Sequence, residues 1–130
     1  MMIKRLALIV FCLGTMACSQ STHFMKMEET LNGYGAAIRW GLWEKAADFQ
    51  VPQKRSRLDL GHLKTIHVTG YDPVYRQEHS GSDVILQTVE IQYYLEDTGL
   101  VKNLTDHQTW QYDKEKGQWL LQSRLPSFKP

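Results

Sequence analysis

The sequence lacks a strong net charge, a long hydrophobic run and any motif that identifies a reaction. Its 15 basic and 14 acidic side chains leave a formal charge of +1, which supplies no field that would attract nucleic acid. The longest apolar run, Leu6–Leu13, has about eight residues, whereas a membrane-spanning helix needs roughly 20. Phosphate-binding, dinucleotide-binding and zinc-binding patterns are absent. The sequence therefore predicts no nucleic-acid partner, no cofactor and no catalytic residue.

The histidines also lack the spacing of metal ligands. His62 and His67 are five residues apart, so a regular strand would place them on opposite faces. The other three are His23, His79 and His107, and no His-x-His or His-x-x-x-His pair occurs. The sequence therefore predicts no metal site. A length of 130 residues with 42% hydrophobic composition is typical of one globular domain.

Cysteine is scarce, and both cysteines lie near the N-terminus, with Cys12 inside the short apolar run and Cys18 after it. Lys4 and Arg5 precede the run. A charged start followed by a short apolar run is typical of a secretory signal. An ordinary cleaved signal and an uncleaved anchor are both compatible with this pattern.

The end of this segment, Gly14–Cys18, resembles the signal of bacterial lipoproteins, in which a small residue precedes a lipidated Cys. Ala17 and Cys18 match these two positions. The resemblance implies that residues 1–17 are removed and that Cys18 becomes the lipid attachment site, carrying palmitate or similar acyl chains. Ser19 after the Cys implies sorting to the outer membrane, on its periplasmic side. A lipidated Cys cannot pair, so the mature domain would have no disulfide.

Residues 84–125 predict three β-strands joined by two turns. From Ile85 to Leu95, apolar and polar residues alternate, which is typical of an antiparallel strand with one solvated face. The apolar pattern favours pairing Glu96 with Val101, across a four-residue loop or a bulge. This register would place Tyr93 opposite Leu104 and Ile85 opposite Tyr112.

The second turn, Lys114–Gly117, would pair Asp113 with Gln118. Tyr112 then faces Trp119 and Trp110 faces Leu121, both on the apolar side. The solvated face gains a row made of Glu90, His107 and Arg124. We interpret this row as solvated charges, and a functional polar site is the alternative.

Before these strands, the apolar period changes to three and four, which predicts an amphipathic helix from Met25. Its apolar positions are Met27, Leu31, Tyr34, Ile38 and Leu42. Residues 18–24 would be a tether, with Ser21 or Thr22 as the helix cap. Small residues four apart, at Gly33, Ala37 and Gly41, indicate a close approach to another element, or an end of the helix at Gly41.

After Gly41, Trp43–Phe49 predicts a second, short helix that stops before Pro52. The basic segment Gln53–Arg57 is interpreted as a solvated loop, with contact to anionic lipid head groups as the alternative. His62–Thr69 predicts the first long strand. Asp72-Pro73 predicts a turn, followed by a short edge strand, Val74–Glu78, and the His79–Asp83 loop.

The Tyr34–Phe49 segment resembles the helix–break–helix opening of NTF2-like domains. Gln108–Tyr112 and Gly117–Leu121 resemble the closing strands of small NTF2-like bacterial lipoproteins. The resemblance covers residues 25–126, leaving residues 127–130 as a tail. It implies a cystatin-like α+β roll, with an N-terminal helix packed on a curved antiparallel sheet of about four strands. The superfamily includes isomerases and dehydratases that use Asp, His or Tyr inside the cone, and no such residue transfers here.

Two hypotheses for function follow. The favoured one is a non-catalytic outer-membrane lipoprotein whose periplasmic domain binds a protein or an envelope component. Exposed apolar residues on the solvated sheet face, at Val84, Leu86 and Tyr94, would serve a protein partner or a homodimer. The alternative is a small-ligand pocket, with or without chemistry, between helix and sheet. Its predicted lining is Tyr34, Trp40, Trp43, Tyr93 and Trp110.

Overall fold

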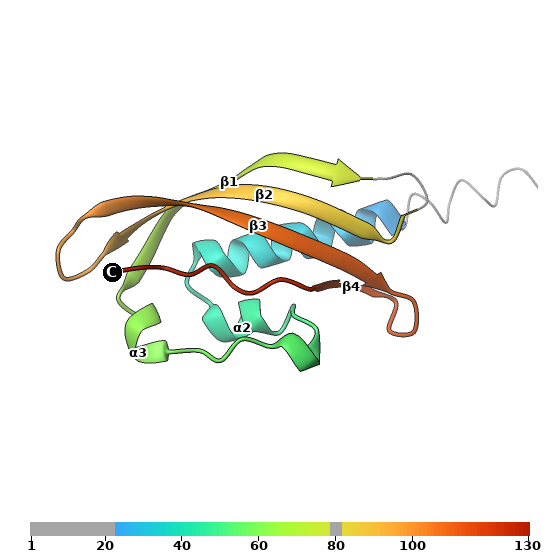
Figure 1. The fold of residues 1–130 in the computed structure, drawn as a ribbon, viewed down its shortest axis with the longest axis horizontal. Helices are drawn as coiled ribbons and strands as arrows, with labels where there is room; N and C mark the ends of the chain where they lie inside the picture. Colours follow the sequence, from blue (N-terminus) through green and yellow to red (C-terminus); the bar gives the residue numbers. More distant parts are fainter. Residues whose placement is uncertain (1–22, 79–81) are drawn as a thin grey trace, which may run out of the picture.

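The computed structural model describes residues 23–78 and 82–130. The predicted signal, the lipid attachment site Cys18, the cap at Ser21 or Thr22 and most of the tether lie outside the described residues. So does part of the His79–Asp83 loop. Within the described chain, an N-terminal helix packs on a four-stranded antiparallel sheet (Figure 1). The predicted α+β class and the order of helix and sheet are confirmed.

Residues 23–39 are helical, and one side of this N-terminal helix faces the sheet. Its buried side chains recur at three and four positions: Met27, Leu31, Tyr34 and Ile38. The helix ends just before Gly41, which is one of the two alternatives for the small residues, because a φ of 67° at Gly41 lets the backbone turn back. The N–H of Leu42 closes the end by donating to the carbonyl of Ala37 at 2.8 Å. Leu42 therefore lies beyond the helix and is exposed, contrary to the predicted apolar face.

Three short helices follow. The α2 helix, Trp43–Ala47, matches the predicted second helix, and a 3-10 turn, Pro52–Lys54, follows it. The α3 helix, Leu60–Leu63, was not predicted. The carboxylate of Asp59 accepts a hydrogen bond from the N–H of His62 and caps α3. The predicted strand over His62–Thr69 is therefore wrong at its start.

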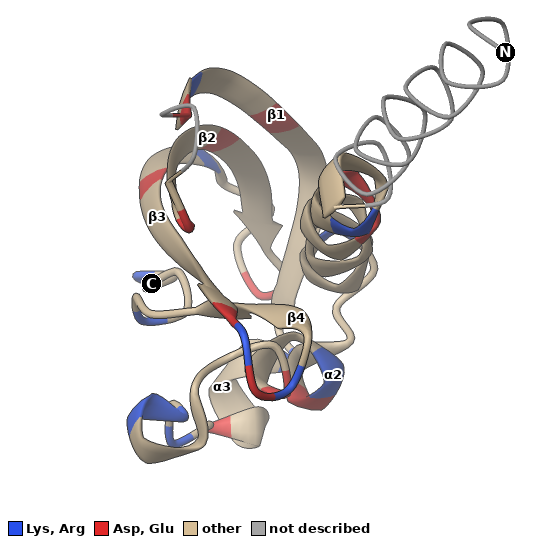
Figure 2. Ribbon diagram, turned by 90° about the vertical axis from the view of Figure 1, so that its right-hand side faces the viewer, with Lys and Arg blue, Asp and Glu red and all other residues tan. Residues whose placement is uncertain are grey.

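The sheet has the order β1-β2-β3-β4, and every neighbouring pair is antiparallel. The strands are β1 Ile66–Glu78, β2 Val84–Leu95, β3 Val101–Asp113 and β4 Gln118–Leu121. The long strands bend strongly, so the sheet forms a concave face towards the N-terminal helix and a convex outer face (Figure 2).

The turn predicted at Asp72-Pro73 is not observed, because both residues lie within β1. The strand continues through Pro73 as far as Glu78, with register shifts between Val68 and Gly70 and between Pro73 and Tyr75. Pro73 is tolerated because β1 is an edge strand, where a missing N–H breaks no ladder on the free side. The separate edge strand predicted from Val74 is thus the second half of β1.

The β2–β3 register differs from the prediction by two residues. Tyr93 faces Lys102 and Ile85 faces Trp110, instead of Leu104 and Tyr112. The four-residue loop was predicted correctly in length but begins one residue earlier. It is closed by a hydrogen bond from the N–H of Leu95 to the carbonyl of Leu100 at 3.2 Å. An even shift preserves the faces, so the same β2 side chains point inwards.

The β3–β4 register is confirmed, with Tyr112 opposite Trp119 and Trp110 opposite Leu121. The predicted outer row of Glu90, His107 and Arg124 does not form. Glu90 faces Thr105, whose hydroxyl donates to its carboxylate at 2.8 Å. His107 faces Thr88, and Arg124 lies beyond the end of β4.

The core lies between the N-terminal helix, α2 and the concave sheet face. Phe128, in the segment expected to be a tail, is buried in this core. Its ring packs edge-on against Trp43 at 5.2 Å and against Tyr93 at 5.0 Å between centroids. The segment is tied down further by the hydroxyl of Tyr93, which donates to the carbonyl of Lys129 at 3.1 Å.

Candidate functional site: a polar chain beneath the N-terminal helix

Buried polar side chains interrupt the apolar concave face of the sheet. Gln87 on β2 and Gln108 and Asp106 on β3 are buried at positions that point towards the helix. A buried polar group is costly unless it is hydrogen-bonded. These side chains meet that requirement by bonding to one another, and they form a continuous polar chain inside the fold.

Gln108 is the centre of this chain. Its carbonyl oxygen accepts from the indole N–H of Trp110 at 3.0 Å and from the amide of Gln87 at 3.3 Å. Its amide nitrogen donates to the carboxylate of Asp106 at 2.8 Å and to the hydroxyl of Tyr71 at 2.9 Å. Because an indole N–H can act only as a donor, Trp110 fixes which end of the Gln108 amide is oxygen.

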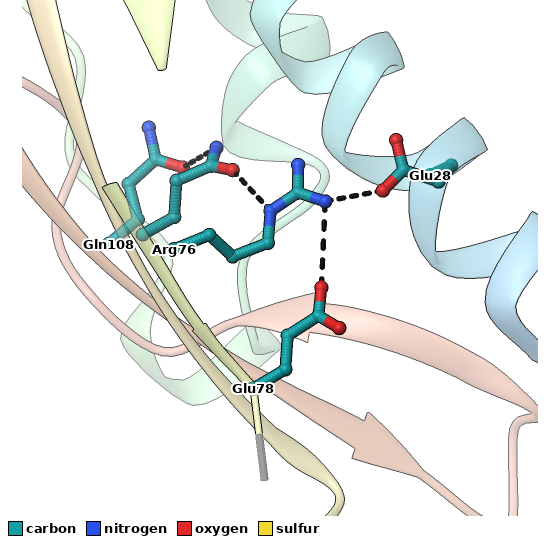
Figure 3. Close-up of polar contacts among 5 residues, drawn as sticks. Glu28, Arg76, Glu78 and Gln108 are labelled. Carbon is teal, nitrogen blue, oxygen red and sulfur yellow. Dashed lines mark hydrogen bonds and ion pairs between the residues drawn. The ribbon is translucent and has the colours of Figure 1, made fainter. Parts of the chain in front are cut away.

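The chain reaches the surface at Arg76 on β1. The Nε of Arg76 donates to the side-chain oxygen of Gln87 at 3.0 Å. Its guanidinium also pairs with Glu28 of the N-terminal helix and, at 3.6 Å, with Glu78 (Figure 3). Arg76 therefore links the helix, the edge strand and the buried amides, and its charge is balanced by carboxylates.

At the inner end, a carboxyl group lies near two phenols. Burial raises the pKa of Asp106, while the hydrogen bond from Gln108 and the charge of His107 act in the opposite direction. Burial, with a further contribution from Asp106, raises the pKa of Tyr71 to about 12 against the effect of its bond to Gln108. Burial and the charge of Asp106 also raise the pKa of Tyr34 well above its ordinary value.

Tyr34 differs from its neighbours because its buried hydroxyl has no hydrogen-bond partner among the described residues. A buried donor without a partner costs about 1–3 kcal/mol. The Tyr34 ring packs edge-on against Trp110 at 5.2 Å and against Phe49 at 5.8 Å between centroids. These contacts hold the ring in place and leave an unused donor close to a carboxyl group.

A groove of about 340 Å³ opens beside this polar chain, between helix and sheet. The helix contributes Asn32, Gly35 and Arg39, and the sheet contributes Tyr71, Arg76 and Gln87. The Tyr71 ring lies directly on the helix backbone, since a Cβ atom added to Gly35 would be 2.7 Å from it. The groove offers amide and guanidinium groups to a small polar ligand, and the Tyr71 ring is part of its lining.

The predicted pocket residues do not form one lining. Tyr34 and Trp110 contact each other in the core, while Trp43 and Tyr93 both pack on Phe128. Trp40 is 71% exposed and lies under the guanidinium of Arg39, whose central carbon is 5.0 Å from the ring centroid. Cys18 lies outside the described residues.

The polar chain itself was missed, although the sequence contained a signal for it. Gln87 shares the parity of the inward-facing Ile85 and Val89, and Gln108 shares that of Trp110. A polar residue at an apolar position of an alternating strand indicates a buried hydrogen-bond network. Tyr71 was not predicted to face the helix, because the turn predicted at Asp72-Pro73 ended the strand before the structure ends it.

Comparisons with known proteins identified no related protein. The sequence matches no protein-family model, no curated protein and no solved structure. Within residues 23–78 and 82–130, no group of three or more His, Cys, Asp or Glu side chains is arranged to hold a metal ion. No helix in the same ranges has the length and apolar character needed to cross a membrane.

Proposed function

We propose that this protein is an outer-membrane lipoprotein, anchored through Cys18, whose periplasmic NTF2-like domain binds a protein or another envelope component without catalysis. The sequence of the signal supports the anchor. A helix lying across a strongly curved antiparallel sheet supports the NTF2-like assignment (Figure 1). A structural use of the concave face is supported by the polar chain, whose members bond to one another around Gln108.

The observation that carries the binding role is the exposed apolar cluster at one end of the outer sheet face. Leu86 on β2 is 43% exposed and Tyr75 on β1 is 57% exposed. Tyr75 faces Thr88, the next outward position after Leu86, so these two side chains are diagonal neighbours. Val84 extends the cluster by one more outward position. Exposed apolar side chains that lie together are typical of protein contacts.

Tyr94, which was expected to lie on the same apolar surface as Val84 and Leu86, lies at the opposite end of the outer face. It stacks on His67, with 4.9 Å between ring centroids, and faces the exposed Val101. Polar side chains of Glu90 and Gln92 separate the two ends. The proposed contact therefore uses the end of the face that carries Leu86, Tyr75 and Val84.

The anchor is tested by the intact mass and fractionation of the native protein beside a Cys18→Ala variant. We expect a mature chain that begins at Cys18 with acyl chains, found in the outer membrane. An unmodified soluble species cleaved elsewhere would contradict the proposal. The variant should lose both the acyl mass and the membrane fraction.

The binding role is tested by crosslinking in intact cells with Leu86→Arg. We expect this change to abolish a crosslinked species that the wild type forms, because a buried charge at an interface is strongly unfavourable. Asn103→Arg is the matched control, since Asn103 is exposed on the polar part of the same face. A crosslink of twice the protein mass would identify a homodimer, and identical crosslinks in both variants would refute the use of this cluster.

A second candidate function is binding of a small polar ligand in the groove between helix and sheet. The groove beside Arg76 and Gln87 favours it, because its volume of about 340 Å³ suits a small molecule. Asn32→Phe would fill this groove from the exposed side of the helix. A compound that raises the Tm of the wild type and not that of Asn32→Phe would support this function, and an equal shift in both would exclude it.

A further inference from the structure

A cleft lies between the segment that follows α2 and the C-terminal segment. It has a volume of about 890 Å³, which is in the range of small-molecule sites. One wall comes from residues 53–63 and the other from residues 122–128. In Figure 2 the basic residues before α3 gather on the far side of the molecule from the N-terminal helix. This cleft shares no lining residue with the groove beneath that helix.

The two walls of the cleft are fastened together by hydrogen bonds. The buried amide of Gln50 donates to the hydroxyl of Ser56 and to the carbonyl of Ser123, both at 3.0 Å. The side-chain oxygen of Gln50 accepts from the backbone N–H of Ser56 at 2.7 Å. At the other end, Nε2 of His62 lies 2.7 Å from the carbonyl of Phe128. The two walls of the cleft are thus joined to each other at both ends.

The charged side chains that line the cleft are mostly positive. Four basic side chains line it, namely Lys54, Arg55, Arg57 and Arg124, against the single carboxyl of Asp59. Arg55 is paired with Asp48, and Asp59 caps α3. Among the described residues, Arg57 and Arg124 take part in no ion pair. Two guanidinium groups on opposite walls are therefore available to an anion.

The same cleft has an apolar component. Trp43, Leu58 and Leu125 line it together with the basic side chains. A simple inorganic anion would use the guanidinium groups and leave this apolar surface against water. A ligand that carries an anionic head next to an apolar part would satisfy both halves of the lining.

We propose that this cleft binds a phosphate-bearing amphiphile, with the phosphate held by Arg57 and Arg124 and the apolar part against Trp43, Leu58 and Leu125. Planar guanidinium groups match phosphate oxygens with paired hydrogen bonds. Lys54 supplies a third positive charge from the same wall as Arg57. The site goes beyond partner binding on the outer sheet face, since it lies at different residues and takes a different ligand class.

The test is calorimetric titration of the full-length protein in a neutral detergent. Dihexanoyl phosphatidic acid is the probe, and dihexanoyl phosphatidylcholine and inorganic phosphate are the comparison ligands. We expect the probe to bind at least about ten-fold tighter than either comparison ligand, because only the probe has both a dianionic head and an apolar part. If inorganic phosphate bound as tightly as the probe, the proposal of an amphiphilic ligand would be wrong. If the probe did not bind, the cleft would not be a binding site for this ligand class.

The variants locate the site. Arg57→Gln with Arg124→Gln should weaken binding by about ten-fold or more. Lys26→Gln with Lys116→Gln is the matched control, since both lysines are exposed and lie outside the cleft. This double variant also removes two positive charges. This control should bind within about two-fold of the wild type. Equal losses in the two double variants would show a general charge effect and refute the cleft.

A spectroscopic measurement keeps the proposal testable if a double variant loses its fold. The probe should shift the indole N–H signal of Trp43 in the wild type and leave that of Trp110 unchanged, because Trp110 is fully buried elsewhere. Equal shifts of both signals, or none at Trp43, would refute the site. Vesicles of phosphatidylcholine with phosphatidic acid should compete with the probe if the head group is recognised on a membrane. Unchanged binding would assign a freely diffusing ligand to the same cleft.

Discussion

Gln87 and Gln108 face each other across β2 and β3, and the amide nitrogen of Gln87 lies 3.3 Å from the carbonyl oxygen of Gln108. This pair is buried on the concave face, where an apolar pair would ordinarily lie. It connects a surface ion pair at Arg76 with a buried carboxyl at Asp106. The interior of this fold is therefore specified by hydrogen bonds as well as by packing.

Replacing Gln108 by Leu should destabilise the protein by about 2–4 kcal/mol, because several buried polar groups would lose their partner. Asp106, Tyr71, Trp110 and Gln87 all bond to this side chain. Urea denaturation measures the change in the free energy of unfolding. Gln111→Leu is the control, because Gln111 is exposed on the same strand. Equal losses in the two variants would show that the chain contributes nothing to stability.

Asp106→Asn should gain stability relative to the wild type as pH rises. Burial raises the pKa of this carboxyl in the folded state above its ordinary value of 3.8. Between those two values the folded state binds more protons than the unfolded state, so the wild type loses stability with rising pH. Denaturation at about pH 4 and about pH 7 measures the difference between the two proteins. A difference that is independent of pH would contradict the raised pKa.

Gly35→Ala should cost about 1–3 kcal/mol of stability, although alanine favours a helix. The added Cβ would lie 2.7 Å from the Tyr71 ring, and that ring is held by its hydroxyl bond to Gln108. Gly33→Ala provides the comparison, because its Cβ would be 3.3 Å from Phe49. Thermal denaturation should show a larger loss for Gly35→Ala. The reverse order would mean that Tyr71 can move aside freely.

The β2–β3 register can be measured with engineered disulfides. Thr88→Cys with His107→Cys should oxidise readily, because these residues are directly opposite on the outer face. Thr88→Cys with Thr109→Cys should not, although the register predicted from the sequence placed those two residues together. Peptide mapping without reductant identifies the bond. Preferential formation of the second disulfide would restore the predicted register.

Strand faces were easier to predict from the sequence than strand partners. Alternation from Ile85 to Leu95 gave the inward side correctly, since a half-buried strand repeats every two residues. The partner register depends on matching apolar positions, and Asp106 and Gln108 weaken that pattern because they are polar and buried. Two registers that differ by two residues then satisfy the same faces, and the loop geometry decides between them.

Local signals misled the prediction where tertiary context prevails. Asp72-Pro73 is typical turn chemistry, yet the free side of edge strand β1 accepts a proline. α3 has a single turn, too short for a helical period to appear in the sequence. The candidate site was missed for a related reason. Tyr71 and Gln108 come from strands that are adjacent to β2 on opposite sides, and their contact needs the correct fold of all three.

The packing of Phe128 between Trp43 and Tyr93 has a consequence for how the chain folds during synthesis. Trp43 leaves the ribosome long before Phe128 does. The aromatic contact that closes the core therefore forms late, after β4 is complete. Until then the nascent chain keeps these apolar rings open to solvent, where a chaperone can bind them. Late closure delays native packing until almost all of the chain up to Phe128 has been synthesised.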